Sequence, residues 1–402
     1  MGQGQSAGTS GARKAVRFYF NGSRVNAFEG DTVACALVRA GVHIFSRSMK
    51  FHRPRGLYCG AGRCVSCAMR VNGVPWVRTC TLPVAEGMMV ESQGGLPTTR
   101  FDSLSVLDHV FRKEFEYRTR FIRPRFLTPV YQRVVRRLAA ASSLPARQEK
   151  YPRVTERSCN VLVIGQGVSG SVASARLRGA DLRGVIAIDR MQGSEDRIPS
   201  VAFGAYEGGE YAVQVGEAVQ ILNPRVVLLA TGRFETGLPL VNSDLPGVLL
   251  PEALSQLASK GVVPGRRAVV VGRNERHQSV LRNLEVLGVR LAGDIEDSSR
   301  ISRVIGGTRV RGVQLASPRQ RMSCDTVVVM GPLLPAVELA RQAGCEMTSK
   351  DGFVRVKTDV SGRTTVPSVF ACGGVAGFIS PAERTRSAER AADAIAQELG
   401  VG

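Results

Sequence analysis

The sequence predicts two fold classes in succession, an α+β segment followed by an α/β segment. Residues 15–100 combine short alternating strand runs, Asn-Gly turns and one short helix, a pattern typical of a small β-rich domain. Residues 159–190 and 266–297 each run as strand, glycine turn, helix and strand, which is the pattern of a parallel α/β unit. The 402 residues exceed one ordinary domain and suit two or three.

The composition indicates a globular protein with a strongly basic surface. Hydrophobic residues make up 44% and charged residues 22%, a balance that excludes wholesale disorder. The 54 Lys and Arg residues exceed the 34 Asp and Glu residues, which gives a formal net charge of +20. This charge favours an anionic partner such as a nucleic acid, a membrane surface or an acidic protein. The arginine-rich stretch 112–137 has no nucleic-acid recognition pattern, so we expect it to face solvent or another subunit.

The sequence also bears on location. No apolar run reaches the roughly 20 residues of a membrane-spanning helix, so we expect no transmembrane segment. The N-terminus has no charged-then-apolar leader, and the odd count of nine cysteines favours a reducing compartment. We therefore expect a cytoplasmic protein, with attachment to the inner membrane face through partners as a further option.

The first domain can be followed element by element. Residues 1–14 are rich in Gly, Ser and Gln and predict a disordered tail before the domain at 15–100. Asn-Gly pairs at 21–22 and 72–73 each separate two strand runs and predict tight hairpins. Between the hairpins, a short helix is expected to begin with Asp31 as its N-cap.

Four cysteines in this domain predict a metal centre. They have the spacing Cys-x4-Cys-x2-Cys-x12-Cys and are Cys59, Cys64, Cys67 and Cys80. Glycines in the same loop let backbone N–H groups approach the sulfides of an iron–sulfur cluster. Three cysteines within nine residues, plus one across a hairpin, predict a 2Fe–2S cluster. Zinc is the alternative, but zinc sites favour two separate cysteine pairs and here the fourth cysteine stands alone. The other five cysteines are expected to be buried as small apolar residues.

The rest of the chain predicts a connector and an α/β domain with an insertion. Residues 101–155 have helical periodicity broken by two prolines and are expected to form a helical connector. The α/β domain is expected over 156–262 and 325–402. The second strand–helix–strand unit falls between these segments, as an inserted domain over 263–324.

A glycine turn at the start of the α/β domain predicts a dinucleotide site. Gly165, Gly167 and Gly170 follow a buried strand and open a helix. They permit a tight turn, an approach of the backbone to pyrophosphate, and helix–strand packing, with the helix N-terminus facing the phosphates. Asp189 ends the next strand, where its carboxylate can accept from a ribose 2′-hydroxyl. That acceptor fits FAD or NAD and disfavours a 2′-phosphate.

The second α/β unit departs from this motif. Its turn reads Gly272-Arg-Asn274-Glu-Arg-His277, and side chains at 274 and 277 would crowd a pyrophosphate. This argues against NAD(P) at the second unit.

The sequence offers no candidate acid–base catalyst. It contains no HExxH, GxSxG or P-loop motif. The four histidines, His43, His52, His109 and His277, lie in contexts that favour structural roles. A subunit that only relays electrons needs no proton-transfer side chain, so we name no catalytic residue.

The segment KFHRPRGLYCGAGRCVSCAMRVNGVPWVRTC carries a family resemblance. It resembles the N-terminal module of the α-type subunits of heteromeric sarcosine oxidase, hydrogen cyanide synthase and opine or proline dehydrogenases. Residues 101–140 are similar to the connector of sarcosine oxidase α subunits. Residues 156–402 resemble flavoproteins with two dinucleotide-binding domains, through Ala-Thr-Gly at 230–232 and VFACGGVAGF at 369–378.

The resemblance implies a fold and a wider cofactor site. The implied fold is a ferredoxin-like β-grasp module followed by a Rossmann-type two-dinucleotide-binding-domain flavoprotein. The residues that the resemblance adds to the cofactor site are Arg190, Thr231, Gly232, Gly373 and Gly374. The family usually has an acidic residue at 374, and only residues 190–231 separate Asp189 from Gly232, so the ADP half of FAD is better supported than the isoalloxazine half. We expect FAD, with NAD, another adenine nucleotide or no nucleotide as alternatives.

The resemblance also implies an activity. It is that of an iron–sulfur flavoprotein α-type subunit in a heteromeric amine or amino-acid dehydrogenase or oxidase, of the sarcosine, proline, opine or glycine class. Such an oxidoreductase subunit relays electrons from a smaller D-amino-acid-oxidase-type flavoprotein subunit to an acceptor, and a further small subunit can be present. Two alternatives stay open, a non-catalytic scaffold subunit with a vestigial nucleotide fold and a basic iron–sulfur protein that binds nucleic acid.

Overall fold

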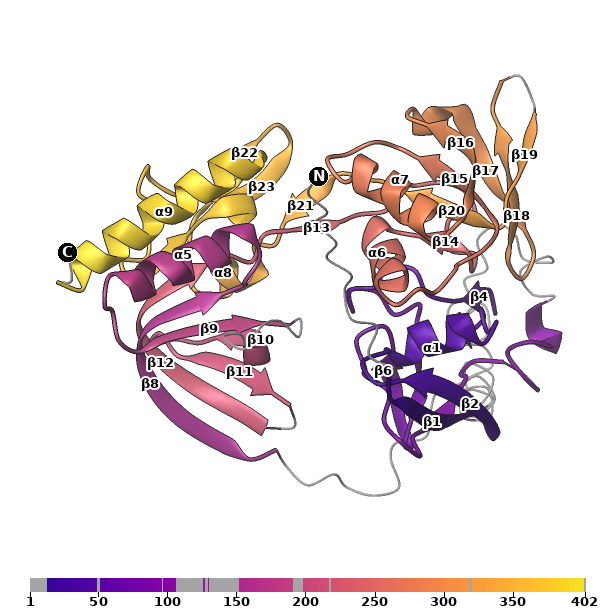
Figure 1. Cartoon of the computed structure of the whole chain (residues 1–402), viewed down its shortest axis with the longest axis horizontal. Helices are drawn as coiled ribbons and strands as arrows, with labels where there is room; N and C mark the ends of the chain where they lie inside the picture. The colour runs from indigo at the N-terminus through magenta and orange to yellow at the C-terminus, as the bar shows by residue number, and fades with distance from the viewer. Residues whose placement is uncertain are drawn as a thin grey trace, which may run out of the picture. The chain divides into compact units, whose positions relative to one another are not determined.

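The structure, a computed structural model, divides the chain into two compact units, each built from two segments (Figure 1). One unit comprises Met1–Gln148 and Glu235–Pro332, and the other comprises Glu149–Phe234 and Leu333–Gly402. The residues that the structure describes are 13–48, 51–95, 97–105, 126, 129, 152–190, 198–216, 218–317 and 320–400. Most of the predicted tail, most of the predicted connector and nearly all of the arginine-rich stretch lie outside these residues. Within them, no helix has both the length and the apolar composition needed to cross a membrane.

The first unit begins with a mixed five-stranded sheet in the order β2-β1-β7-β5-β6. The central pair β1–β7 is parallel and the other pairs are antiparallel. The strands are β1 (Ala15–Phe20), β2 (Ser23–Phe28), β5 (Ala68–Val71), β6 (Val74–Arg78) and β7 (Met89–Glu91). Both Asn-Gly pairs, at 21–22 and 72–73, have positive φ at both residues and close the two hairpins, which confirms the predicted turns.

Helix α1 (Val33–Arg39) packs its apolar residues into the core of this module. Its N-cap is Thr32, whose hydroxyl accepts from the Cys35 N–H at 3.3 Å, so the prediction of Asp31 as N-cap is wrong. The Asp31 carboxylate is fully buried; it accepts from the Phe28 N–H at 3.0 Å and pairs with Arg39. Asp31 therefore closes the turn after β2, and the next polar residue caps the helix.

The inserted segment of the first unit contains a parallel four-stranded sheet in the order β14-β20-β15-β16. An antiparallel meander of three strands follows β16. The elements are β14 (Val248–Leu249), α6 (Pro251–Ser259), β15 (Arg267–Val271), α7 (His277–Val286), β16 (Arg290–Ile295), β17 (Ile301–Gly306), β18 (Val310–Leu315), β19 (Arg321–Ser323) and β20 (Thr326–Val329). We predicted the insertion over 263–324, whereas the structure places it over 235–332, because β14 pairs with β20 and α6 packs near that sheet.

The second unit is built on a six-stranded sheet in the order β11-β10-β9-β8-β12-β24. Its strands and main helices are β8 (Val154–Ile164), α5 (Val168–Gly179), β9 (Val185–Asp189), β10 (Ile198–Ala205), β11 (Tyr211–Val215), β12 (Ala218–Leu229), β24 (Val369–Ala371) and α9 (Pro381–Glu398). Along β8, Val161 and Val163 pack with residues of α5 and α9, while Leu162 and Ile164 join a separate apolar cluster. Burial on both faces explains why these parallel strands read as continuous apolar runs. The fold places the turn after β8 at the carboxyl edge of the sheet.

Short elements complete the described chain. They are β3 (Ser46–Arg47), β4 (Pro54–Arg55), η1 (Ser103–Ser105), β13 (Arg233–Glu235), η3 (Ser298–Arg300), β21 (Leu333–Pro335), α8 (Glu338–Gln342), β22 (Met347–Lys350), β23 (Phe353–Val356) and η4 (Gly373–Ala376).

Candidate functional site

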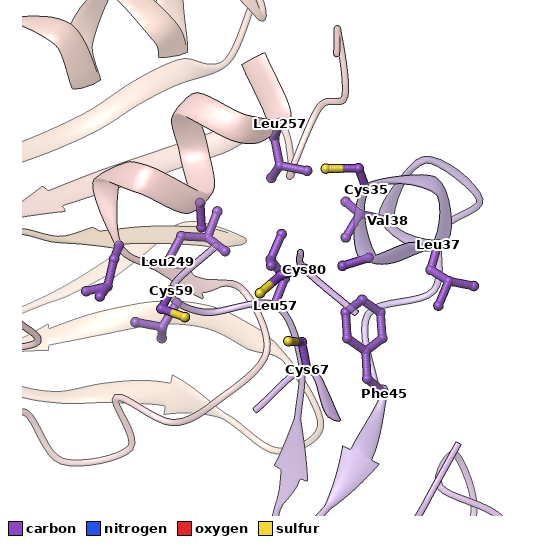
Figure 2. Close-up of a cluster of buried hydrophobic side chains, with 14 of the residues drawn as sticks. Cys35, Leu37, Val38, Phe45, Leu57, Cys59, Cys67, Cys80, Leu249 and Leu257 are labelled. Atoms are coloured by element: carbon purple, nitrogen blue, oxygen red, sulfur yellow. The ribbon is translucent and has the colours of Figure 1, made fainter. Parts of the chain in front are cut away.

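The four predicted cysteines meet in the first unit. The sulfur of Cys64 lies 3.3 Å from that of Cys59, and the thiol of Cys80 contacts both Cys59 and Cys67. Figure 2 shows Cys59, Cys67 and Cys80 in one buried region, and these three are 5%, 1% and 0% exposed. Among the described residues, no three or more His, Cys, Asp or Glu side chains lie in an arrangement that could hold a metal ion. The sulfurs instead contact one another in the series Cys64, Cys59, Cys80 and Cys67.

The loop that carries the cysteines supplies backbone donors to sulfur. The Ala61 N–H donates to the Cys59 sulfur at 3.5 Å, and the Gly62 N–H donates to the Cys80 sulfur at 3.2 Å. Gly60 and Gly62 have φ of +66° and +67°, a conformation that L side chains rarely adopt. Four converging thiols with N–H groups directed at them fit a 2Fe–2S cluster.

The contacts between the thiols separate their acidities. The hydrogen bond that Cys64 donates lowers the pKa of Cys59, and the same bond raises the pKa of Cys64. A bond from Cys80 lowers the pKa of Cys67, while the pKa of Cys80 is raised, first by its bond to Cys59. Cys59 and Cys67 are thereby favoured as thiolates, the form that binds metals.

Apolar side chains surround the cysteines on their inner side, and the loop tip is open. The surrounding residues that Figure 2 labels are Leu37, Val38, Phe45, Leu57, Leu249 and Leu257. At the tip, Val65 is 62% exposed and Arg63 is also exposed. The site is therefore shielded from water except at the residues between Cys59 and Cys67.

The second unit brings the predicted dinucleotide residues together at the ends of β8 and β9. Gly165 has φ of +100°, and a Cβ on Gly170 would lie 1.8 Å from the Gly165 carbonyl oxygen. Gly167 is exposed, has nothing within 4 Å of an added Cβ, and begins α5 without a capping side chain. Asp189 accepts from the Gln166 N–H at 2.7 Å. An uncapped helix N-terminus beside open space and a nearby carboxylate fit the ADP part of a dinucleotide.

The residues expected from the family resemblance lie in part beside this turn. A Cβ on Gly373 would lie 2.1 Å from the Ser169 hydroxyl, which places η4 against the first turn of α5. A Cβ on Gly374 would lie 2.9 Å from the Arg233 side chain and 3.2 Å from the Gly232 backbone. An acidic side chain at 374 would therefore require its neighbours to move.

Two further residues predicted for the cofactor site are Thr231 and Arg190. The Thr231 hydroxyl donates to the Ala336 carbonyl at 2.8 Å and so serves the turn after β12. Arg190 follows β9 and is exposed.

The turn of the second α/β unit is filled by its own side chains. The Asn274 side-chain amide donates to the Gly331 carbonyl at 2.8 Å and accepts from the Arg276 N–H at 2.9 Å. His277 is buried, and its Nε2 lies 2.9 Å from the Asp294 carboxylate. Asp294 lies in β16, at the place where a ribose-binding acid is expected. The Arg276 guanidinium lies 2.7 Å from the carboxylate of Glu252. These side chains therefore fill the space at the turn that we expected to be crowded.

The described histidines have structural surroundings. His52 is buried and bonds the Asp102 carboxylate at 2.9 Å, and the buried Arg47 donates to the His52 carbonyl at 2.8 Å. Burial and the nearby Arg309 lower the pKa of His43 to about 4. His109 lies outside the described residues. The five cysteines outside the cluster are all buried, as predicted.

Sequence reasoning missed the contribution of α6 to the cysteine site. A Cβ on Gly60 would lie 2.6 Å from the Ala253 Cα, and the side chain of Gln256 bonds the Cys80 carbonyl. These residues are far apart in the sequence, and α6 carries no motif that would have indicated the contact.

Comparisons with known proteins find relatives for both parts of the chain. Residues 13–95 match the family described as a 2Fe-2S iron-sulfur cluster binding domain, and residues 284–397 match the pyridine nucleotide-disulphide oxidoreductase family. The chain is 26% identical over 462 residues to sarcosine oxidase subunit alpha of Rhizobium meliloti, covering 96% of this chain and 46% of that subunit. The chain thus spans about half the length of that curated relative.

Two other proteins match a small part and nearly all of the chain, respectively. Hydrogen cyanide synthase subunit HcnA of Pseudomonas aeruginosa is 32% identical over 91 residues, which are 23% of this chain and 83% of HcnA. The crystal structure of L-proline dehydrogenase from P. horikoshii shares the fold with a TM-score of 0.72 at 18% identity, over 98% of this chain and 75% of that one.

One of these matches decides between the two metal centres that the sequence left open. The match to the 2Fe-2S family selects the iron–sulfur cluster over zinc. Together with the oxidoreductase relatives, it confirms the predicted fold class and the prediction of an oxidoreductase. It also confirms the two predicted cofactors, which are a 2Fe–2S cluster and FAD. The chain therefore belongs to the family of iron–sulfur α-type subunits that includes sarcosine oxidase subunit alpha, and HcnA shares its cysteine-bearing domain.

Proposed function

We propose that this chain is the electron-transfer subunit of a heteromeric amine or amino-acid dehydrogenase or oxidase. The observation that carries the proposal is the four-thiol site, which is shielded by apolar residues on its inner side and open at Arg63 and Val65. When bound, a 2Fe–2S cluster takes up and releases one electron at a time. The protein's part is to hold the thiolates in place, exclude water and leave one short path from the cysteines to the surface.

The second unit would hold FAD through its ADP part. We assign the pyrophosphate to the turn of Gly165, Gly167 and Gly170, where the N-terminus of α5 is uncapped. The Asp189 carboxylate would accept a hydrogen bond from a ribose hydroxyl, either in place of the Gln166 N–H or together with it. Gly374 leaves the flavin's ribityl chain without the acidic partner that the family usually provides there.

The oxidation of the amine is assigned to a partner. His52 and His277 are only 3% and 6% exposed, so a substrate cannot reach either imidazole to give up a proton. A relative of this chain is the alpha subunit of sarcosine oxidase, which supports a heteromeric assembly. We propose a smaller D-amino-acid-oxidase-type flavoprotein as the partner that cleaves the C–H bond and delivers electrons to this chain.

The complex purified from its native source tests the proposal. We expect about two iron atoms and two acid-labile sulfides per chain, bleaching of the cluster absorption by an amino-acid substrate, and FAD retained in stoichiometric amount. Cys67→Ser should abolish the cluster signal, while the control Cys345→Ser, a buried thiol in the other unit, should keep it. Absence of iron and sulfide from the native complex would refute the proposal. A cluster without stoichiometric FAD would favour the scaffold alternative for the second unit.

A further inference from the structure

We propose that helix α6 of the inserted segment is a working part of the iron–sulfur site and that Gln256 is its positioning residue. In this arrangement, Gln256 fixes the peptide of Cys80, and the apolar face of α6 keeps water from the inner side of the cysteines. The inference rests on the proposed function only through the presence of the cluster.

Helix α6 contacts the cysteine loop at successive points along its length. Just before the helix, the Leu250 N–H donates to the Tyr58 carbonyl at 2.9 Å. In the first turn, the backbone of Ala253 lies so close to Gly60 that no Cβ fits between them. Both elements belong to one unit, and Figure 2 shows Leu257 of α6 facing the cysteine region. The helix therefore contacts the cysteine loop at several positions along its length.

The side chain of Gln256 joins three elements through its two polar ends. Its Nε2 donates to the carbonyl of Cys80 at 2.6 Å, and its Oε1 accepts from the Cys35 thiol of α1 at 3.6 Å. Cys80 is the ligand that stands apart from the loop, so its orientation depends on the backbone after β6. A carbonyl held in place fixes the peptide plane and, through it, the direction of the Cα–Cβ bond toward the cluster.

A neutral amide suits this position better than a charged group. A glutamine can donate to a carbonyl and accept from a thiol at the same time, whereas a carboxylate can only accept. A carboxylate at 256 would face the Cys80 carbonyl oxygen without a hydrogen and would add a negative charge beside an anionic cluster.

The second α/β unit provides independent support, because its nucleotide turn is already occupied. Asn274 and His277 are bonded to groups of the same segment, and Arg276 is directed at Glu252 near the start of α6. The pair of Arg276 with Glu252 also ties this turn to the helix that contacts the cysteine loop.

The test uses the full chain in its native complex, with the near-isosteric variants Gln256→Glu and Gln256→Leu. Loss of one net hydrogen bond should speed cluster loss to an iron chelator about five- to tenfold. Gln256→Glu should also move the midpoint potential of the cluster to more negative values and alter its electron paramagnetic resonance spectrum. The matched control Gln278→Glu, the same substitution at an exposed glutamine of α7, should leave all three unchanged.

Wild-type loss rates, potential and spectrum in both Gln256 variants would overturn the inference while leaving the proposed function intact. A wild-type complex without a cluster would instead remove the proposed function. If a variant fails to fold, hydrogen–deuterium exchange of the wild-type chain decides. The amides of α6 should exchange more slowly with the cluster bound than after its removal, and those of α7 should not change. Equal exchange of α6 in both states would contradict the inference.

Discussion

Replacing Gly60 with alanine should weaken the contact between the cysteine loop and α6. The left-handed backbone at Gly60, with φ of +66°, costs an alanine about 1–2 kcal/mol. The added Cβ would also lie 2.6 Å from the Ala253 Cα and 2.8 Å from its nitrogen, and overpacking of this kind costs about 1–3 kcal/mol. The two effects predict a loss of roughly 2–5 kcal/mol in the unfolding free energy of the first unit.

Urea unfolding followed by circular dichroism measures this loss, with cluster absorption recorded in the same samples. The matched control is Gly73→Ala, because Gly73 has φ of +84° with nothing within 4 Å of an added Cβ. Gly73→Ala should carry the backbone cost alone, about 1–2 kcal/mol, and should keep the cluster. Equal losses in the two variants would show that α6 does not press on the loop and would refute this reasoning.

Other outcomes can be checked in the same way. The added Cβ of Gly167→Ala meets no protein atom within 4 Å, so this variant should keep nearly the same stability but retain less FAD per chain. The control Gly179→Ala, at the end of the same helix, should retain FAD. Flavin fluorescence after denaturation measures the FAD content of both variants. Burial lowers the pKa of His43 to about 4, so stability is fully present above pH 6.5 and should fall as the pH drops toward 4. His43→Gln should flatten that dependence in urea midpoints, and an unchanged slope would exclude His43 as its source. Arg47→Met should cost about 3–5 kcal/mol, because it removes the guanidinium that lies 3.8 Å from the buried Asp102 carboxylate, while Arg176→Met at an exposed pair should cost far less.

The features that sequence reasoning predicted are those encoded by neighbouring residues. The Asn-Gly hairpins, the four-cysteine loop and the glycine turn after β8 each lie within a short stretch, so spacing alone defines their local geometry. The cysteines and the glycine turn also carry the family resemblance. In these stretches the local backbone preference and the tertiary structure agree.

The features that were missed depend on contacts between distant segments. Gln256 and the Cys80 carbonyl are 176 residues apart, and nothing near either residue indicates their meeting. The insertion begins earlier than predicted because β14 is only two residues long and is defined by its pairing with β20. The cap of α1 was misplaced by one residue because Asp31 and Thr32 can both cap a helix, and the burial of Asp31 decides between them.

The joining of the cysteine module to a segment that begins at residue 235 limits how the protein can be dissected. A fragment that stops at residue 95 would match a complete ferredoxin-type family, yet it would expose the apolar surface that Leu249, Ala253 and Leu257 normally cover. Such a fragment should be prone to aggregation and should lose its iron readily. Anyone transplanting this redox module into another enzyme should carry residues 235–332 along as its lining.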